Sequence, residues 1–320
     1  MKTPSAKVVG PTLQAPPTTK SEKLLNHFKA YFWLYLFLVP TLLWYAIFCY
    51  GPMSGVIIAF KRYKISHDSI WEAPWVGFKW FESFFKGYYA TTIIRNTLVL
   101  SFYGLATFPL PVIFALMINE VNNAKFKNVV QTIMYAPHFI SVVVLVSMIN
   151  IFFADSGLVN LLLTNLGLDR VNFLTSPDSF PHMYVWSFVW QNLGWNCIIY
   201  VAALSSVDPA LHEAATLDGA NRIQKIWHIN LPTILPTVVI TLIMRVGSIM
   251  ASNTDKVLLM LNELNADTAE VIGTFVYNRG LTKADFSYAT AVGLFSNVIN
   301  LILLLTVNKI SEKVTETSLF

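Results

Sequence analysis

Residues that could carry out catalysis or bind a metal are few and scattered along this sequence. The two cysteines, Cys49 and Cys197, each lie inside an apolar run, and His138 and His182 stand apart from other ligand types. No set of histidine, cysteine and carboxylate residues has the spacing of a metal site. No Gly-x-x-x-x-Gly-Lys segment is present to hold the phosphates of a nucleotide. The sequence therefore predicts that the chain is not an enzyme and binds no cofactor through these motifs.

A more informative pattern lies between residues 206 and 232. Asp208 followed by Pro209 is typical of a helix N-cap with proline at the first helical position. Gly219, a residue type that tolerates a left-handed turn, is predicted to end this short helix. A second short helix follows, and Pro232 marks the start of an apolar helix. We expect a helix-turn-helix elbow whose small residues allow close approach of another protein's backbone.

This elbow resembles the EAA loop of type I importer permeases. The glycine stands six residues after the glutamate of the motif, and the isoleucine stands ten residues after the glycine. The resemblance implies that residues 205–232 are cytoplasmic and fit a cleft on a separate ATPase subunit, which binds ATP and magnesium in place of this chain. The coupling residues that it implies are Glu213, Ala214, Ala215, Asp218, Gly219, Ala220, Ile229, Leu231 and Pro232.

Other stretches are similar to carbohydrate importer permeases, and most similar to the branch that handles complex or acidic oligosaccharides such as alginate, aldouronate or rhamnogalacturonan fragments. These stretches are 51–60, 75–78, 135–140 and 286–295. The resemblance covers roughly residues 30–310. It implies oligosaccharide import across the bacterial inner membrane by alternating access, with a second homologous permease, two ATPase subunits and an extracytoplasmic solute-binding protein as partners.

Candidate residues for the sugar path follow from the same resemblance. A sugar needs hydrogen-bonding groups and an aromatic face within a concave site. In the related maltose permease, the segments matching residues 183–204 and the following apolar run line the sugar site. Carried over by position, this implies Trp190, Asn192, Gly194 and Asn253 as path residues. The tryptophans could equally face lipid or the membrane interface.

Polar residues inside the later apolar runs have more than one interpretation. Arg245 lies near the middle of its run, where a charge is costly and usually faces a cavity or a partner. We expect it either to help hold an acidic sugar or to contact the partner permease. Asn297 and Asn300 share one helix face, and we expect them to join helices rather than bind a ligand.

A membrane scaffold must position these residues. Only 12% of the residues are charged and 55% are hydrophobic, whereas about 25% are charged in an average soluble domain; mean hydropathy is +0.54. Six apolar segments are long enough to cross a bilayer, which takes about 20 helical residues. We predict an all-α integral membrane protein of the type I ABC importer fold, whose prolines we expect to produce packing kinks rather than a hinge. The predicted crossings are 31–59, 95–118, 129–153, 183–204, 233–252 and 286–307.

The predicted organisation has three parts. Residues 1–30 read as a disordered basic cytoplasmic tail, residues 31–310 as the six-helix permease domain, and residues 311–320 as a cytoplasmic C-terminal tail. Eleven of the 22 lysines and arginines lie on the predicted cytoplasmic side and the other eleven lie outside or in helices, so the positive-inside rule does not fix the orientation. The basic tail and the EAA loop place both termini in the cytoplasm.

Two other classes of membrane protein are less consistent with the sequence. A proton-coupled secondary transporter commonly uses intramembrane carboxylates, but Glu120 and Asp285 lie only at the ends of apolar runs. No inverted repeat is evident. A polytopic membrane enzyme would need paired catalytic residues at a membrane edge, and the sequence shows none.

Overall fold

The computed structural model describes residues 20–315 and 317–319, and the chain divides into two units, 1–56 and 57–320. The first nineteen residues of the predicted disordered tail lie outside the described residues. Its last part, Lys20–Ala30, is helix α1. Within the described ranges the only β-type pairing is an isolated antiparallel bridge between Lys61 and Trp75. The predicted all-α membrane architecture is confirmed.

The first unit is a nearly continuous apolar helix. After α1, its elements are α2 (Phe32–Trp44), a π-helical stretch (Tyr45–Tyr50) and α3 (Gly51–Met53). Pro40 lies inside α2 without ending the helix. No side chain of α2 is buried within the chain. Because these side chains are aromatic and aliphatic, they need lipid or another protein against them.

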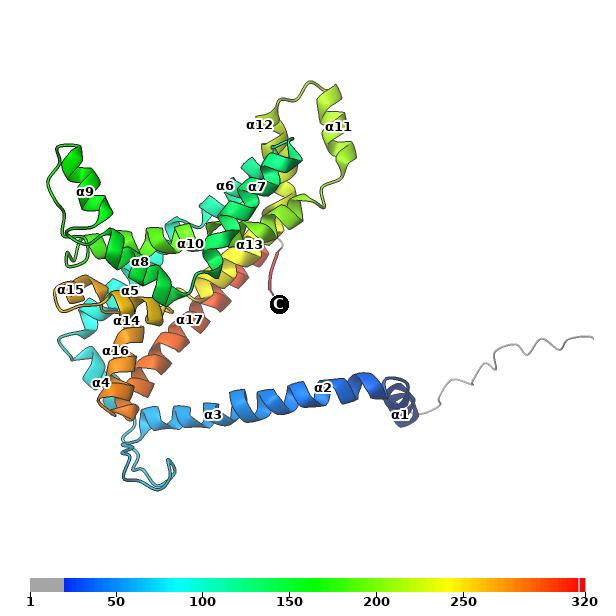
Figure 1. Cartoon of the computed structure of the whole chain (residues 1–320). Helices are drawn as coiled ribbons and strands as arrows, with labels where there is room; N and C mark the ends of the chain where they lie inside the picture. The colour runs from blue at the N-terminus through cyan, green and yellow to red at the C-terminus, as the bar shows by residue number, and fades with distance from the viewer. Residues whose placement is uncertain (1–19, 316, 320) are drawn as a thin grey trace, which may run out of the picture. The chain divides into compact units, whose positions relative to one another are not determined.

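The second unit holds the remaining helices (Figure 1). Helix α10, which is 26 residues long, supplies residues to two of the three apolar core clusters. Helix α10 packs along α6 and α13, and α13 packs along α17. The elements are α4 (Lys79–Phe85), α5 (Ala90–Ala106), α6 (Pro109–Asn119), α7 (Ala124–Tyr135), α8 (Val142–Phe152), α9 (Leu158–Asn165), α10 (Ser179–Leu204), α11 (Pro209–Leu217), α12 (Arg222–Lys225), α13 (Leu231–Gly247), α14 (Thr254–Met260), α15 (Ala266–Ala269), α16 (Ile272–Tyr277) and α17 (Phe286–Thr315).

Four segments within the described ranges are long and apolar enough to span a membrane by themselves. They are Phe32–Phe60, Ala90–Asn119, Arg222–Gly247 and Phe286–Thr315. A bent pair, Ala124–Phe139 with Val142–Phe152, is a fifth candidate. The remaining predicted crossing, 183–204, the fourth in chain order, lies within α10, whose 26 residues extend about 39 Å. This helix is long enough to cross but is not among the segments that meet the apolar criterion.

The third predicted crossing is not a single helix with a packing kink. Helix α7 ends at Tyr135, a short 3-10 turn covers Ala136–Phe139, and α8 leaves at an angle of 98° to α7. Pro137 lies in this turn, and Ser141 caps α8 by accepting a hydrogen bond from the Val144 N–H. A break of this size redirects the chain rather than bending a continuous helix. The prediction of a simple packing kink at Pro137 was therefore wrong.

Candidate functional site

Two neighbouring cavities lie among α5, α10 and α13. The serine cavity holds about 300 Å³, and the aromatic cavity holds about 350 Å³. Gly104, Phe188 and Arg245 line both, so the two cavities meet at these residues. The other polar residues of the serine cavity are Ser101, Tyr184, Ser248, Ser252 and Asn253. The other aromatic and polar residues of the aromatic cavity are Thr107, Phe108, Trp195, Asn196, Tyr200 and Thr241.

Arg245 lies in the last turn of α13 and not near the middle of a crossing, as its place in the sequence suggested. A cation in a final helical turn interacts favourably with the carbonyl end of the helix dipole. The Arg245 Cζ lies 5.1 Å from the centre of the Phe188 ring, a cation–π contact. On the other side, a Cβ at Gly104 would stand 3.4 Å from the Arg245 Nη2, so the glycine leaves room for the guanidinium.

The Arg245 guanidinium has no carboxylate partner in the described part of the chain. The one ion pair found there joins the exposed side chains of Lys86 and Glu82 at 3.5 Å, at the C-terminal end of α4. Arg245 is exposed in this single chain, and the surface that it exposes lines both cavities. Its hydrogen-bond donors are therefore available to an anionic ligand or to a partner chain.

Asn253 and Tyr184 form the far wall of the serine cavity. The Tyr184 hydroxyl accepts a hydrogen bond from the Asn253 N–H at 3.1 Å. The Asn253 Oδ1 caps α14 by accepting from the Lys256 N–H, also at 3.1 Å. The Oγ of Ser252 is buried with no partner in the structure. An unpaired buried hydroxyl in a polar cavity marks a position where a ligand or water gains a hydrogen bond.

Lys256 is a second cation beside this wall. Only 1% of the residue is exposed, and its Nζ donates to the Tyr184 carbonyl at 3.0 Å. The Nζ also lies 5.0 Å from the Tyr184 ring centre and 6.0 Å from the Phe188 ring centre. Burial lowers the pKa of Lys256 to about 7, because the charged form loses its hydration. Sequence reasoning missed this residue, since it lies on a short helix outside the predicted crossings.

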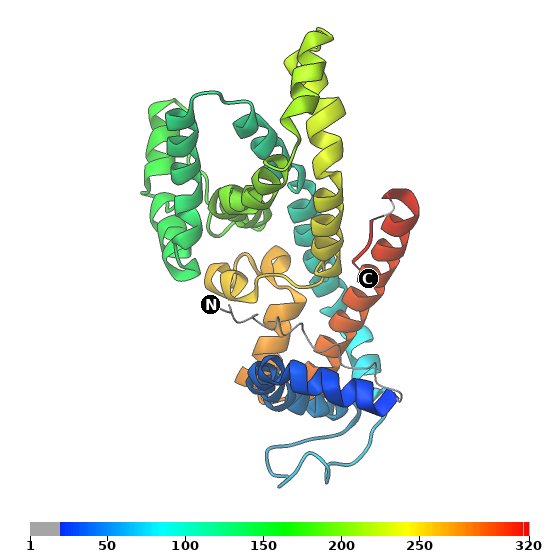
Figure 2. The same ribbon diagram turned by 90° about the vertical axis from the view of Figure 1, so that its right-hand side faces the viewer.

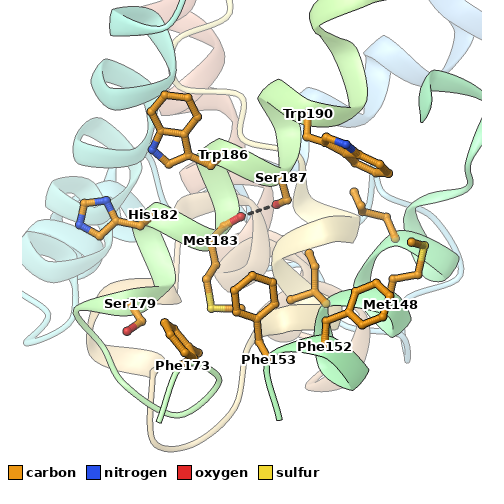
Figure 3. Close-up of a pocket in the computed structure, with 12 residues that line it drawn as sticks. Met148, Phe152, Phe153, Phe173, Ser179, His182, Met183, Trp186, Ser187 and Trp190 are labelled. Carbon is orange, nitrogen blue, oxygen red and sulfur yellow. Dashed lines mark hydrogen bonds between the residues drawn. The ribbon is translucent and has the colours of Figure 1, made fainter. Parts of the chain in front are cut away.

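The remaining predicted path residues lie on other faces of α10. Trp190 lines a separate cavity of about 550 Å³ walled almost entirely by apolar side chains, where Figure 3 shows it with Trp186, Met148 and Phe152. The Asn192 Oδ1 bonds to the His138 Nδ1 at 3.1 Å. The structure therefore brings together Arg245 and Asn253 but neither Trp190 nor Asn192.

Gly194 is a packing position between α10 and α7. A Cβ at Gly194 would collide with the Met134 carbonyl, so only glycine permits this approach of the two helices. The expectation for Asn300 is confirmed, because its Oδ1 accepts from the Met250 N–H at 2.9 Å and so joins α17 to the segment that follows α13. These residues hold the cavity walls in place and do not line the cavities themselves.

The predicted elbow is present as helices α11 and α12, which project from the N-terminal end of α13 (Figure 1, Figure 2). The Asp208 side chain accepts from the Ala210 N–H at 2.9 Å, which confirms the predicted N-cap. Gly219 has φ of +76°, which confirms the left-handed turn. Asn221 and Gln224 cap α12 reciprocally, and α13 starts with Pro232 in its first turn.

The surface of this elbow is open to a partner. Glu213, Ala214, Asp218, Gly219 and Pro232 are exposed, whereas Ala215, Ala220, Ile229 and Leu231 are half-buried. Leu217 is 90% exposed and Trp227 is 62% exposed. The Lys225 Nζ donates to the Thr216 Oγ1 at 2.7 Å and ties α12 to α11. Exposed apolar side chains on such a surface are typical of a region that contacts another protein.

Comparison with known proteins identifies the family. Residues 107–316 match the family described as "Binding-protein-dependent transport system inner membrane component". The chain is 42% identical to protein LplB of Bacillus subtilis (strain 168), over 90% of this chain and 91% of the relative. It is 39% identical to the polygalacturonan/rhamnogalacturonan transport system permease protein YteP of the same organism, over 94% of each.

Solved structures agree with this assignment. The fold is similar to a chain of a bacterial alginate ABC transporter in complex with an alginate pentasaccharide-bound periplasmic protein, with a TM-score of 0.86 and 39% identity, covering 93% of this chain and 100% of that one. A second structure, of a bacterial ABC transporter involved in the import of the acidic polysaccharide alginate, gives a TM-score of 0.85 at 40% identity, covering 92% and 99%. This chain therefore belongs to the family of binding-protein-dependent transport system inner membrane components, and it is the transmembrane permease of an ABC importer rather than a catalytic subunit.

Proposed function

We propose that this permease imports oligosaccharides released from uronic acid polysaccharides, and that Arg245 holds a carboxylate of the cargo. The observation that carries this proposal is the unpaired guanidinium lining the two cavities. The names of two relatives support it, since polygalacturonan and alginate are both polymers of uronic acids. A neutral sugar gives no physical reason to keep a cation unpaired at this position, where its desolvation is costly.

The cavity offers a complete set of contacts for a carboxylate. Arginine presents a planar fork that binds a carboxylate through two parallel hydrogen bonds. The Phe188 ring lies beside the guanidinium, and Gly104 leaves room for it at the junction of the two cavities. The unpaired Ser252 Oγ supplies a further donor, and the Asn253 side chain lines the same cavity. In this proposal, Trp190, Asn192 and Gly194 belong to the path only as residues of α10 that shape its surroundings.

The proposed topology has six crossings with both termini in the cytoplasm. Helix α13 starts at the elbow and ends two residues beyond Arg245, so the guanidinium lies about 20 Å along the helix from Leu231. With the elbow on the cytoplasmic side, this distance places the two cavities toward the extracytoplasmic side. A sugar released by a solute-binding protein would then reach the serine cavity first.

The proposed energy source lies outside this chain. In this proposal the elbow seats in a cleft on one of two ATPase subunits, which bind the ATP and magnesium, while a second homologous permease completes the path. Closure of the ATPase pair moves the elbows together and opens the crossings outward, and hydrolysis reverses the motion. Such a cycle needs a cargo whose affinity differs between the two states, and an arginine that moves relative to its partner chain supplies that difference.

Substitution of Arg245 tests the proposed cargo. The variant Arg245→Gln keeps a similar length and polarity but removes the charge. In the reconstituted complex, we expect this variant to need roughly ten- to a hundred-fold more binding protein, loaded with a galacturonate oligosaccharide, for the same rate of uptake as the wild type. Uptake of a neutral oligosaccharide that the complex also carries should change much less. Arg95→Gln, an exposed position on α5, should leave both unchanged.

Two results would contradict the proposal. Equal losses for the acidic and the neutral cargo would show that Arg245 serves assembly rather than charge recognition. Failure of every oligosaccharide-loaded binding protein to stimulate the ATPase activity of the wild-type complex would reject oligosaccharide import itself. Arg245→Lys separates bidentate recognition from charge alone, because lysine keeps the charge but not the planar fork.

A further inference from the structure

Trp195 is the largest side chain of the aromatic cavity, and its surroundings are unusual for a tryptophan in an apolar helix. The residue is 45% exposed although it lies well inside α10. Its ring stacks on the His138 ring, with centroids 4.2 Å apart and planes within 6°. Phe139 packs edge-on against the same indole at 6.0 Å. The part of the indole that these two residues leave uncovered lines the cavity.

A chain of hydrogen bonds fixes the position of the His138 ring. The Asn192 Nδ2 donates to the Phe188 carbonyl at 3.1 Å, which turns the Asn192 Oδ1 toward His138. The oxygen accepts from the His138 Nδ1, so this nitrogen carries the proton. The break between α7 and α8 brings His138 to this place. The histidine therefore backs the indole from a fixed position.

The exposed indole surface and the Arg245 guanidinium belong to one cavity. Its volume of about 350 Å³ is within the range of sites for small ligands. An indole gives a flat apolar surface to the C–H face of a pyranose, and a guanidinium binds a carboxylate on that ring. The indole N–H of Trp195 also has no partner in the described residues, so it can donate to a sugar hydroxyl.

We propose that Trp195 is the stacking platform for a hexuronate ring whose carboxylate binds Arg245, and that Asn192 and His138 are positioning residues for this platform. This inference rests on the proposed function and adds a subsite to it. It assigns recognition of the ring to one wall of the aromatic cavity and recognition of the charge to the junction of the two cavities. Asn192 thus serves the sugar path through His138 rather than by direct contact.

The test replaces the indole while keeping the cavity filled. In the reconstituted complex with its partner permease, ATPases and binding protein, Trp195→Leu removes the flat surface, and Trp195→Phe keeps most of it. For a galacturonate oligosaccharide we expect the apparent KM of uptake to rise roughly ten-fold in Trp195→Leu and less than three-fold in Trp195→Phe. Trp186→Leu, which removes an exposed indole from the apolar cavity on another face of α10, should leave KM within two-fold.

The positioning residues are tested by a conservative variant. Asn192→Asp keeps an oxygen that accepts from His138, whereas Asn192→Leu does not. We expect Asn192→Leu to raise KM by a similar factor to Trp195→Leu, and Asn192→Asp to restore a KM near that of the wild type. A purely structural role would instead lower the amount of assembled complex in Asn192→Leu with KM unchanged, and that result would overturn the assignment.

The outcomes separate this inference from the proposed function. Unchanged KM in Trp195→Leu, with normal uptake of the uronide, would overturn the stacking platform while leaving uronide import intact. If Trp195→Leu does not assemble, the wild-type complex labelled with 5-fluorotryptophan gives the answer. The Trp195 fluorine resonance is identified by its absence in Trp195→Phe. We expect this resonance to shift when the uronide-loaded complex is held in its cargo-bound state. An unchanged resonance would overturn the inference.

Discussion

At the scale of single residues, two cations share the aromatic face of α10. Arg245 and Lys256 lie 5.1 Å and 6.0 Å from the Phe188 ring centre. The negative face of an aromatic ring attracts cations without adding a carboxylate that would compete with an anionic cargo. Of the two, only Arg245 lines the cavities, so its guanidinium donors stay available to a ligand, whereas Lys256 is buried and donates to the Tyr184 carbonyl.

Lys256 gives stability a pH dependence that a variant can remove. The unfolded state holds the lysine proton up to about pH 10, whereas the folded state loses it near pH 7. Between these values the unfolded state binds more protons, so stability rises with pH. We expect the free energy of unfolding of the wild type to rise by about 1 to 3 kcal/mol from pH 7 to pH 9, and its melting temperature to rise with it. Lys256→Met should lack this rise while being more stable at pH 7.

The control for this prediction is Lys64→Met, which removes an exposed lysine from the second unit. It should keep the pH dependence of the wild type. Thermal unfolding of the purified protein in a mild detergent, followed at several pH values, provides the measurement. Identical pH profiles for the wild type and Lys256→Met would show that the buried amine does not change its protonation in this range.

Part of the candidate site could be predicted from the sequence on physical grounds. Arg245 stands out because a charge in an apolar run is costly, and Asn253 came from family resemblance. Tyr184 and Phe188 are ordinary residues in α10, and only the fold shows that they face Arg245 and Lys256. Trp190 follows Phe188 by about 200° around the helix, so it lines a different cavity. A single sequence shows which residues are unusual but not which helix face meets which partner.

At the scale of elements, the elbow is the feature that the sequence predicts most completely. Its N-cap at Asp208, its turn at Gly219 and the start of α13 at Pro232 all come from local rules that do not depend on the rest of the fold. Local hydrogen bonds fix each of these features. This explains why the hairpin is regular although little of it is buried.

Gly219→Val tests the elbow as a coupling element. A β-branched residue at φ of +76° is strained, and its side chain adds bulk at the tip of the hairpin. We expect the variant to insert in the membrane and bind cargo-loaded binding protein, but to lose at least ten-fold of uptake per ATP hydrolysed. The measurement is simultaneous ATPase activity and uptake in proteoliposomes.

Gly167→Val is the matched control for the elbow. Gly167 also has positive φ, +79°, and a Cβ there would likewise meet no atom within 4 Å, but it lies after α9, away from α11. Equal loss of coupling in both variants would point to general strain instead of a role for the elbow. Normal coupled transport in Gly219→Val would count against that role directly.

The break between α7 and α8 shows what local rules leave undetermined. Pro137 predicts an interruption, but its angle depends on which groups accept the freed backbone atoms. The Gln191 Nε2 donates to the Ile140 carbonyl at 2.7 Å, and His138 of the turn stacks on Trp195. Both partners come from α10, some fifty residues later in the chain. The 98° bend is therefore a tertiary feature that no pattern around Pro137 contains.

At the scale of the whole molecule, the composition of α10 explains why this helix is not among the segments that are apolar enough to span a membrane. It has no Asp, Glu, Lys or Arg, but it includes Gln191, Asn192 and Asn196, which lower its mean hydropathy. Gln191 bonds to another element and Asn192 to His138, whereas Asn196 lines the aromatic cavity. A central helix that lines a polar path needs such side chains, so its low hydropathy is what the proposed function requires.

Whether α10 crosses the membrane can be decided by labelling its two flanks. Leu166, 75% exposed after α9, precedes α10, and Leu217, 90% exposed on α11, follows it. If α10 crosses, cysteines at these positions lie on opposite sides of the membrane. In a background with Cys49→Ser and Cys197→Ala, we expect an impermeant maleimide to label Leu166→Cys in intact spheroplasts. Leu217→Cys should be labelled only in inverted vesicles or after permeabilisation, because the proposed topology puts the elbow in the cytoplasm. Labelling of both positions from one side would reduce the crossings to five and reject the six-helix topology.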